Sequence, residues 1–203
     1  MGQLRIIGGR WKRTPIPVLE LPGLRPTPDR VRETLFNWLG PNLSGWRCLD
    51  LFAGSGSLSF EAVSRGAAHA TLLDRDAKAC ALMQALIDKL NGREQMQVIR
   101  ADALQWLDSQ QKKGISDPFD LIFLDPPFGS NLGAQTLEKA VNWLSDEGLV
   151  YLESGQALDP EQAKALELQL MRADKAGAVH YHLLRRIHKR GEHHADCSLS
   201  GDL

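Results

Sequence analysis

Cysteine is scarce in this chain, with three residues among 203. Cys48, Cys80 and Cys197 are an odd number for a disulfide framework, and they lie too far apart for a metal knuckle. His180 and His182 would share one face of a strand, without a second ligand type at metal-binding spacing. We therefore expect reduced cysteines and no metal site.

Long apolar runs are absent too. No stretch approaches the roughly 20 apolar residues that cross a bilayer as a helix. The opening residues Met1-Gly2-Gln3-Leu4-Arg5 contain no apolar signal core, and Ile6 stands where a myristoylation signal has serine or threonine. We expect a cytoplasmic, monomeric protein with no membrane partner.

The chain also lacks an excess of charge of one sign, since 24 lysines and arginines stand against 25 aspartates and glutamates. The distribution is uneven, however: residues 1–47 carry a formal charge of +5 and the remainder −6. A basic amino-terminal part on an acidic body is typical of proteins that bind a polyanion, although solvated surface would explain it equally well.

From residue 47 onward, strand and helix patterns alternate regularly. This alternation predicts an α/β, Rossmann-like fold with a seven-stranded, mostly parallel, doubly wound sheet. The last two strands are joined by a short link, so they should pair antiparallel at one edge. The expected strands are residues 47–52, 70–74, 97–101, 120–125, 149–153, 166–171 and 179–185.

Residues 3–8 and 11–19 flank Gly8-Gly9 and predict an amino-terminal β-hairpin, which is followed by a helix that starts near Thr27 and Pro28. We therefore expect three parts. An extension of residues 1–46 precedes the Rossmann-like domain of residues 47–187, and a polar tail of residues 188–203 should be disordered.

A glycine turn follows the first strand of that domain, in the run Asp50-Leu51-Phe52-Ala53-Gly54-Ser55-Gly56. Gly54 and Gly56 would let a ligand approach the backbone closely, and the next helix would direct its free amino-terminal amides toward that ligand. The third glycine of a dinucleotide fingerprint is missing, because Ser59 occupies its place. A purely structural turn is the alternative.

Acidic residues mark the ends of the next three strands. Asp74 lies 18 residues after Gly56, and Asp102 and Asp125 follow the third and fourth strands. Since parallel strands end at the same edge of a sheet, these carboxylates and the glycine turn should line one crevice, which suits an adenosine-containing cofactor. Taken alone, each aspartate is better explained as a helix cap.

The tetrapeptide Asp125-Pro126-Pro127-Phe128 directly follows the apolar run Leu121-Ile122-Phe123-Leu124. The prolines stop the strand and leave a carboxylate, stiff carbonyls and an aromatic ring at its end. This set favours a methyl-transfer enzyme acting on a ring amine over a nicotinamide enzyme. A proline-rich turn, with Phe128 merely covering the sheet, is the structural alternative.

The glycine turn and this tetrapeptide together resemble class I S-adenosylmethionine-dependent methyltransferases that modify exocyclic amines. Further segments are similar to the bacterial 16S ribosomal RNA guanine-N2 methyltransferase D family over about residues 3–186. These segments are Arg5-Ile6-Ile7-Gly8-Gly9, Arg25-Pro26-Thr27, Arg30-Val31-Arg32-Glu33-Thr34-Leu35-Phe36-Asn37-Trp38-Leu39 and Ser64-Arg65-Gly66-Ala67. The resemblance implies methylation of N2 of guanine 966 in 16S rRNA, within the small subunit or an assembly intermediate.

The resemblance also implies roles for individual residues. Asp125 and the Pro126 carbonyl would orient the guanine amine, and Phe128 would stack on the extruded base; the catalytic set is Asp125, Pro126, Pro127 and Phe128. S-adenosylmethionine would be held by Asp50, Gly54, Gly56, Asp74, Asp102, Ala103 and Asp125. Asp50 would hold its amino group and Asp74 its ribose. Relatives commonly have glutamate in place of Asp74, so Asp76 is a second candidate for the ribose.

The basic amino-terminal part would contact RNA phosphates without reading sequence. The candidates are Arg10, Lys12, Arg13, Arg25, Arg30 and Arg32. For Arg30, an ion pair with Glu33 at helical spacing is an equally good explanation.

Two other functions fit part of the pattern. An adenine-N6 DNA methyltransferase uses a similar tetrapeptide, but the 46 residues outside the domain leave little room for a module that reads duplex DNA. A non-catalytic RNA-binding assembly factor could share the fold, although the intact glycine turn and Asp125 argue for catalysis.

Overall fold

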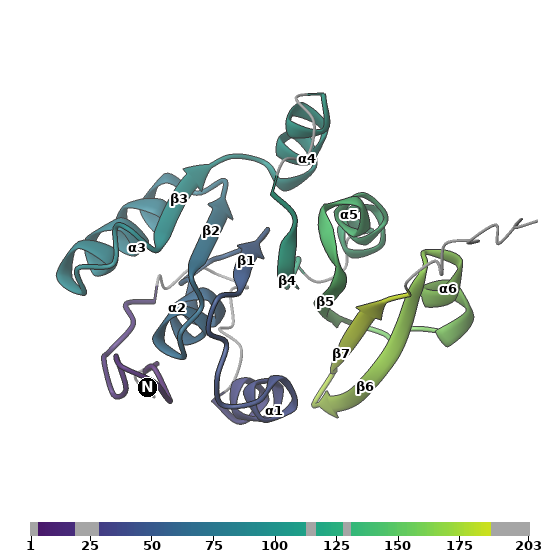
Figure 1. The fold of residues 1–203 in the computed structure, drawn as a ribbon, viewed down its shortest axis with the longest axis horizontal. Coiled ribbons are helices and arrows are strands. Elements are labelled where there is room, and N and C mark those ends of the chain that lie inside the picture. Colours follow the sequence, from purple (N-terminus) through teal and green to yellow (C-terminus); the bar gives the residue numbers. More distant parts are fainter. Residues whose placement is uncertain (1–3, 19–28, 113–116, 128–130, 188–203) are drawn as a thin grey trace, which may run out of the picture.

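A seven-stranded sheet forms the centre of the protein in the computed structural model, which describes residues 4–18, 29–112, 117–127 and 131–187. Its strand order is β3-β2-β1-β4-β5-β7-β6 (Figure 1). The strands are β1 (Arg47–Asp50), β2 (His69–Asp74), β3 (Met96–Arg100), β4 (Phe119–Leu124), β5 (Leu144–Ser154), β6 (Leu168–Ala176) and β7 (Val179–Arg186). Neighbours pair in parallel from β3 to β5, and β7 pairs antiparallel with both β5 and β6. The predicted sheet is confirmed.

Two strands exceed their predicted lengths by more than one residue. β5 starts at Leu144, directly after the short 3-10 helix η1 (Val141–Trp143), and its irregular first part pairs with Phe119. β6 extends to Ala176, and Gly177, with φ of +63°, takes part in the turn to β7. Most of this extension is exposed and polar, because β6 is an edge strand, so it carries no hydrophobic signal.

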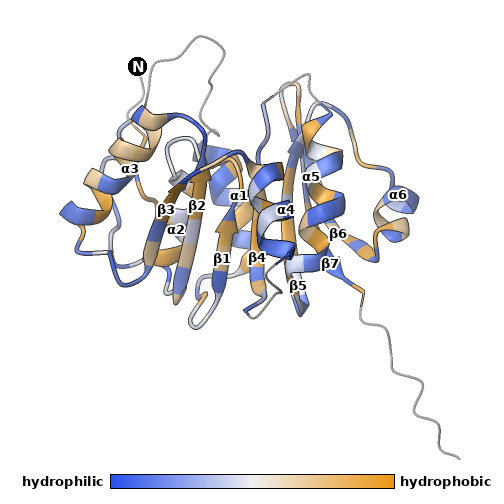
Figure 2. Cartoon of the chain, turned by 90° about the horizontal axis from the view of Figure 1, so that it is seen from above, coloured by the Kyte–Doolittle hydropathy of each residue, from blue (hydrophilic) through white to orange (hydrophobic). Residues whose placement is uncertain are grey.

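Helices cover both faces of the sheet (Figure 1). On one face, α1 (Asp29–Leu39), α2 (Ser57–Ser64) and α3 (Ala77–Lys89) contribute to one hydrophobic cluster. On the other, α4 (Ala103–Gln111), α5 (Leu132–Ala140) and α6 (Pro160–Ala165) contribute to a second. Alternation along β4 serves both clusters: Phe123 packs in the first and Ile122 in the second. Figure 2 shows the apolar strands lying between helices whose outer sides carry many polar residues.

Residues 4–18, called the arm below, cross the outer side of α2. The predicted hairpin is present in reduced form: one antiparallel bridge joins Arg5 and Pro15, and the Ile6 amide donates to the Thr14 carbonyl at 3.0 Å. Pro15 and Pro17 lack the amide hydrogens that a longer ladder would need. Leu4, Ile6 and Ile16 of the arm are buried in the same cluster as α2.

Within the described part of the chain, none of the helices is long and apolar enough to cross a membrane. Cys48 and Cys80 are free thiols, while Cys197 and the whole of the tail 188–203 lie outside the described residues. No group of three or more potential metal ligands occurs in the ranges described. His182 has a structural role instead, because its Nε2 accepts a hydrogen bond from the Leu158 amide at 3.1 Å.

Candidate active site

The strand ends that carry the expected site lie side by side. β3, β2, β1 and β4 are consecutive and parallel, with Asp74 paired to Arg100 and Asp50 paired to Phe123. Their carboxyl ends therefore form one edge, from which the connections to α2, α3 and α4 depart. The glycine turn, Asp74, Asp102 and Asp125 all follow or end these strands, as the sequence analysis expected.

The two glycines of the turn have different reasons to be glycine. Both are left-handed, with φ of +55° at Gly54 and +73° at Gly56. A Cβ on Gly56 would lie 2.9 Å from Cε2 of Phe60 and 3.1 Å from a methyl carbon of Leu72, so α2 approaches β2 closely there. A Cβ on Gly54 would meet none of the described atoms within 4 Å. Packing therefore explains Gly56, while Gly54 borders open space at the strand edge.

Asp74 fixes the turn from the neighbouring strand. Its Oδ2 accepts a hydrogen bond from the Gly54 amide at 2.8 Å, and its Oδ1 accepts one from the Asp76 amide at 2.8 Å. Asp76 caps α3 by accepting from the Lys78 and Ala79 amides. Each carboxylate oxygen has a second lone pair, so the Asp74 side chain can hold the turn and still accept from a ligand hydroxyl.

Asp102 and Ala103 stand at the start of α4. Asp102 is the N-cap of that helix, and its Oδ1 accepts from the Gln105 amide at 3.1 Å. Ala103 is buried as the first helical residue. The cap explanation is thus correct for Asp102, which is half-exposed at the same edge as Asp74. It is wrong for Asp74, because the N-cap of α3 is Asp76.

Asp50 is a buried carboxylate, only 2% exposed, at the end of β1. Burial raises its pKa from 3.8 to about 7, against the hydrogen bond that Ser59 Oγ donates at 2.9 Å. Ser59 occupies the position of the missing third glycine, so the departure from the fingerprint provides a donor to Asp50. An acid that is hard to ionise suits a cationic ligand group, because a nearby positive charge offsets the cost of burying the anion.

The tetrapeptide begins directly after β4. Asp125 is half-buried, Pro126 is buried and Pro127 is exposed, while Phe128 lies outside the described residues. Pro126 packs against the start of α5, since a Cβ on Gly133 would lie 3.3 Å from its Cγ. This packing holds the Pro126 backbone at the edge of the sheet.

Two polar residues of β5 lie near Asp125 and are not among the site residues expected from the sequence. The Tyr151 hydroxyl donates to Oε1 of Glu153 at 2.8 Å, and both side chains are buried. Burial raises the pKa of Tyr151 above its usual value, and the charges of Glu153 and Asp125 raise it further. The feature of the sequence that could have indicated this pair is Glu153, a glutamate at the end of a strand predicted to be buried.

The basic candidates divide into exposed and buried residues. Arg10, Lys12 and Arg13 are exposed on the arm, and Arg30 is exposed on α1. Arg25 lies outside the described residues. The prediction for Arg32 is wrong.

Arg32 is 0% exposed and cannot contact a phosphate in this conformation. Its Nη2 donates to the Arg5 carbonyl at 2.8 Å and to Oδ1 of Asp29 at 2.6 Å. The physical reason is that the arm lies against α1 and covers a helix face that would otherwise be open to solvent.

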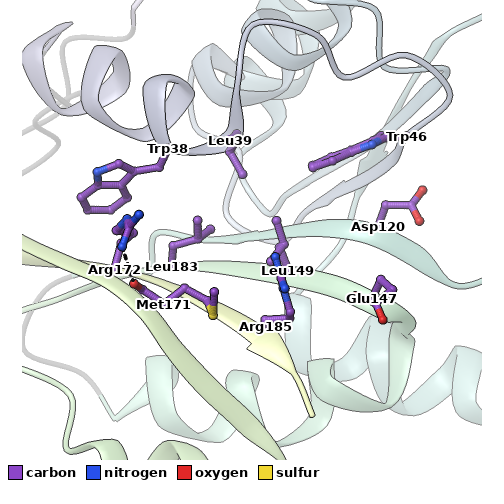
Figure 3. A pocket seen from close by; sticks show the side chains of 10 residues that line it. All are labelled: Trp38, Leu39, Trp46, Asp120, Glu147, Leu149, Met171, Arg172, Leu183 and Arg185. Carbon is purple, nitrogen blue, oxygen red and sulfur yellow. Dashed lines mark hydrogen bonds between the residues drawn. The ribbon is translucent and has the colours of Figure 1, made fainter. Parts of the chain in front are cut away.

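A hollow of about 460 Å³ lies between α1 and the sheet, toward the amino ends of β1 and β4 (Figure 3). Trp38 and Leu39 of α1 lie over it, Trp46 precedes β1, and Asp120 is near the start of β4. It shares no lining residue with the expected crevice. Asp120 is already engaged there, because it accepts from the Arg47 amide and from Ser145 Oγ.

Several known proteins resemble this chain over most of its length. The model of a family described as Conserved hypothetical protein 95 matches residues 4–185. The Ribosomal RNA small subunit methyltransferase D of Escherichia coli strain K12 is 43% identical over 199 residues, which cover 96% of this chain and 96% of that protein.

A protein of the same name from Haemophilus influenzae is 40% identical over 185 residues, which cover 90% of this chain and 93% of the relative. Among solved structures, a putative methyltransferase from Escherichia coli superposes with a TM-score of 0.77 at 40% identity. That match covers 93% of this chain and 100% of the other. The likeness therefore extends over the arm, the glycine turn and the sheet.

Proposed function

Because this chain belongs to the family of the ribosomal RNA small subunit methyltransferase D proteins, we propose that it methylates N2 of guanine 966 in 16S ribosomal RNA. The methyl donor is S-adenosylmethionine. One observation of the structure carries the proposal further than the family name: the glycine turn and Asp125-Pro126-Pro127 follow the adjacent strands β1 and β4, at one edge of the sheet.

The edge offers groups that fit each part of the cofactor. The buried Asp50 carboxylate suits the amino group, and the open space beside Gly54 suits the methionine chain. We assign Asp74 to the ribose, and Asp102 with Ala103 to the adenine, because all three lie at this edge. When bound, S-adenosylmethionine supplies a methyl group that its sulfonium already activates, so the chain's own residues need to orient the acceptor more than to activate the donor.

Asp125 and Pro126 orient the acceptor amine. The lone pair of a guanine N2 is delocalised into the ring, and hydrogen bonds from its protons to the Asp125 carboxylate and the Pro126 carbonyl direct that lone pair toward the methyl group. The packing of Pro126 against Gly133 keeps the carbonyl in place. In-line positioning of this kind can supply up to ~7 to 11 kcal/mol of barrier lowering. Stacking by Phe128 remains a prediction about a residue outside the described ranges.

The substrate side of the proposal concerns residues 1–46. We assign phosphate contacts to Arg10, Lys12, Arg13 and Arg30, which are exposed, and keep Arg25 as a prediction. Residues 47–187 form the methyl-transfer domain. The proposal also includes a monomeric, metal-independent enzyme that acts in the cytoplasm on the small subunit or on an assembly intermediate of it.

The test is methyl transfer from labelled S-adenosylmethionine to partly assembled small subunits, naked 16S RNA and duplex DNA, with identification of the modified nucleoside. We expect N2-methylguanosine from ribosomal substrate. N6-methyladenine from DNA would support the alternative enzyme, and cofactor binding without transfer would support a non-catalytic assembly factor.

Asp125→Ala tests the assigned chemistry. We expect transfer to be lost while cofactor affinity changes little, because the carboxylate faces the acceptor. Asp146→Ala is the matched control, since Asp146 is an exposed aspartate of the neighbouring strand β5. Persistent turnover by Asp125→Ala would exclude the role given to that carboxylate.

A further inference from the structure

Helix α2 follows the glycine turn and packs against the arm. It begins directly after Gly56, and all eight of its residues are buried. One side packs on the sheet, where Ser59 donates to Asp50, and the arm covers the outer side. The part of the protein proposed to bind RNA is therefore in direct contact with the helix that follows the glycine turn.

Glu61, one turn into α2, is the centre of this contact. It is 0% exposed, and its carboxylate accepts from the Ile7 amide at 2.6 Å and from the Gly8 amide at 2.8 Å. Arg65 Nε donates to the same carboxylate at 2.7 Å. The buried charge is thus matched by one guanidinium and two arm amides, which is the kind of pairing that makes burial of a carboxylate tolerable.

Ser64 extends the contact along the helix. Its hydroxyl donates to the Gly8 carbonyl at 2.5 Å and accepts from the Trp11 amide at 2.9 Å, and its carbonyl accepts from the Arg10 amide at 2.8 Å. Backbone groups of residues 7–11 are therefore tied to little more than one turn of α2. The exposed Arg10, Lys12 and Arg13 lie within or beside this tied segment.

Gly9 permits the close approach. Its φ is +71°, and a Cβ there would lie 1.8 Å from the Ser64 carbonyl oxygen. Any other residue would have to move the arm away from the helix, because a backbone oxygen cannot give way.

We propose that Glu61 is a positioning residue for the RNA substrate. By holding residues 7–11 on α2, it fixes the basic side chains of the arm relative to the glycine turn, so the RNA phosphates are bound in register with the methyl donor. This inference rests on the proposed function. A preformed arm spares the cost of ordering it when RNA binds, so loss of the Glu61 contacts weakens RNA binding more than it slows transfer.

Two variants release the arm from opposite sides. Glu61→Gln keeps the volume and places an amide donor against groups that donate. Gly9→Ala acts from the arm and leaves α2 unchanged. Gly45→Ala is the matched control, because Gly45 has φ of +85° and a Cβ there meets none of the described atoms within 4 Å. It carries the same kind of backbone strain without the collision.

The measurements are KM and kcat for small-subunit particles, the Kd of S-adenosylmethionine, and amide exchange at Ile7 and Gly8. For both variants we expect KM to rise about 10-fold, with kcat and cofactor Kd within about twofold and faster exchange in the arm. Gly45→Ala should keep the wild-type KM. Should Glu61→Gln fail to fold, Gly9→Ala alone decides.

Faster exchange with an unchanged KM would overturn the inference, because Glu61 would then serve stability only. An equal weakening of cofactor binding would also overturn it, since the effect would then lie in the glycine turn. These outcomes differ from failure of the proposed function, in which the wild-type protein itself would not methylate the particles.

Discussion

The Asp74 carboxylate accepts a hydrogen bond from the Gly54 amide at 2.8 Å, so the end of β2 holds the turn that follows β1. A hydrogen-bond acceptor at this position therefore helps to shape the glycine turn before any ligand arrives. Helix capping and ligand binding are not exclusive explanations for the aspartates of this edge, because one carboxylate has lone pairs enough for both.

Alanine at the two glycines of the turn should have different effects. Gly56→Ala should lower the free energy of unfolding by about 2 to 5 kcal/mol, because it adds a collision with Phe60 and Leu72 to the strain of a positive φ. Gly54→Ala should cost about 1 to 2 kcal/mol from backbone strain alone but weaken S-adenosylmethionine binding more than about 10-fold. Urea unfolding and calorimetric titration check both values. Equal losses of stability would contradict the distinction.

Asp50 should make stability depend on pH. Burial raises its pKa from 3.8 to about 7, so the folded state binds more protons than the unfolded state between these values. Its contribution is fully present below about pH 3.8 and is lost as pH rises through about 7. Relative to wild type, Asp50→Asn should gain on the order of 2 to 3 kcal/mol of unfolding free energy between about pH 5 and pH 8.

The measurement is urea unfolding of both proteins without cofactor at the two pH values. The same variant should bind S-adenosylmethionine poorly at neutral pH, because no carboxylate faces the amino group. A difference between wild type and variant that stays constant with pH would show that Asp50 does not titrate in this range.

Lys12 and Arg32 should differ in their effect on RNA binding. Lys12 is exposed on the arm, so Lys12→Ala should reduce the slope of log affinity against log salt by about one unit or slightly less. Arg32 is buried against Asp29 and the Arg5 carbonyl, so Arg32→Met should leave that slope unchanged. Binding to 16S RNA over a salt series checks both. A reduced slope for Arg32→Met would restore it as a phosphate contact.

The sheet, and the gathering of the candidate residues at one edge of it, could be predicted because their signals are local. Strand patterns, the glycine turn and the Asp125-Pro126-Pro127 stop can each be recognised within a few residues, and the rule that parallel strands end at one edge brings them together. The extension of β6 to Ala176 could not be predicted, because an exposed edge strand has no apolar pattern.

The contacts of the arm could not be predicted from the sequence. Its contacts with α2 join residues more than 50 positions apart, such as Ile7 and Glu61. Arg32 looked like surface charge because the helix pattern cannot show that a distant segment covers it. In the sequence alone, Glu61 looks like an ordinary helical glutamate.

The place of β7 in the sheet has a consequence for how the protein is made. Among the described strands, β6 pairs with β7 alone, and β7 lies between β6 and β5. On a chain synthesised from its amino terminus, β1 to β5 leave the ribosome before β6 and β7, which are close together in the sequence. The parallel part, with the complete glycine turn, can therefore assemble while residues 179–186 are still inside the ribosome. The β6–β7 hairpin then joins the free edge of β5 as one late unit.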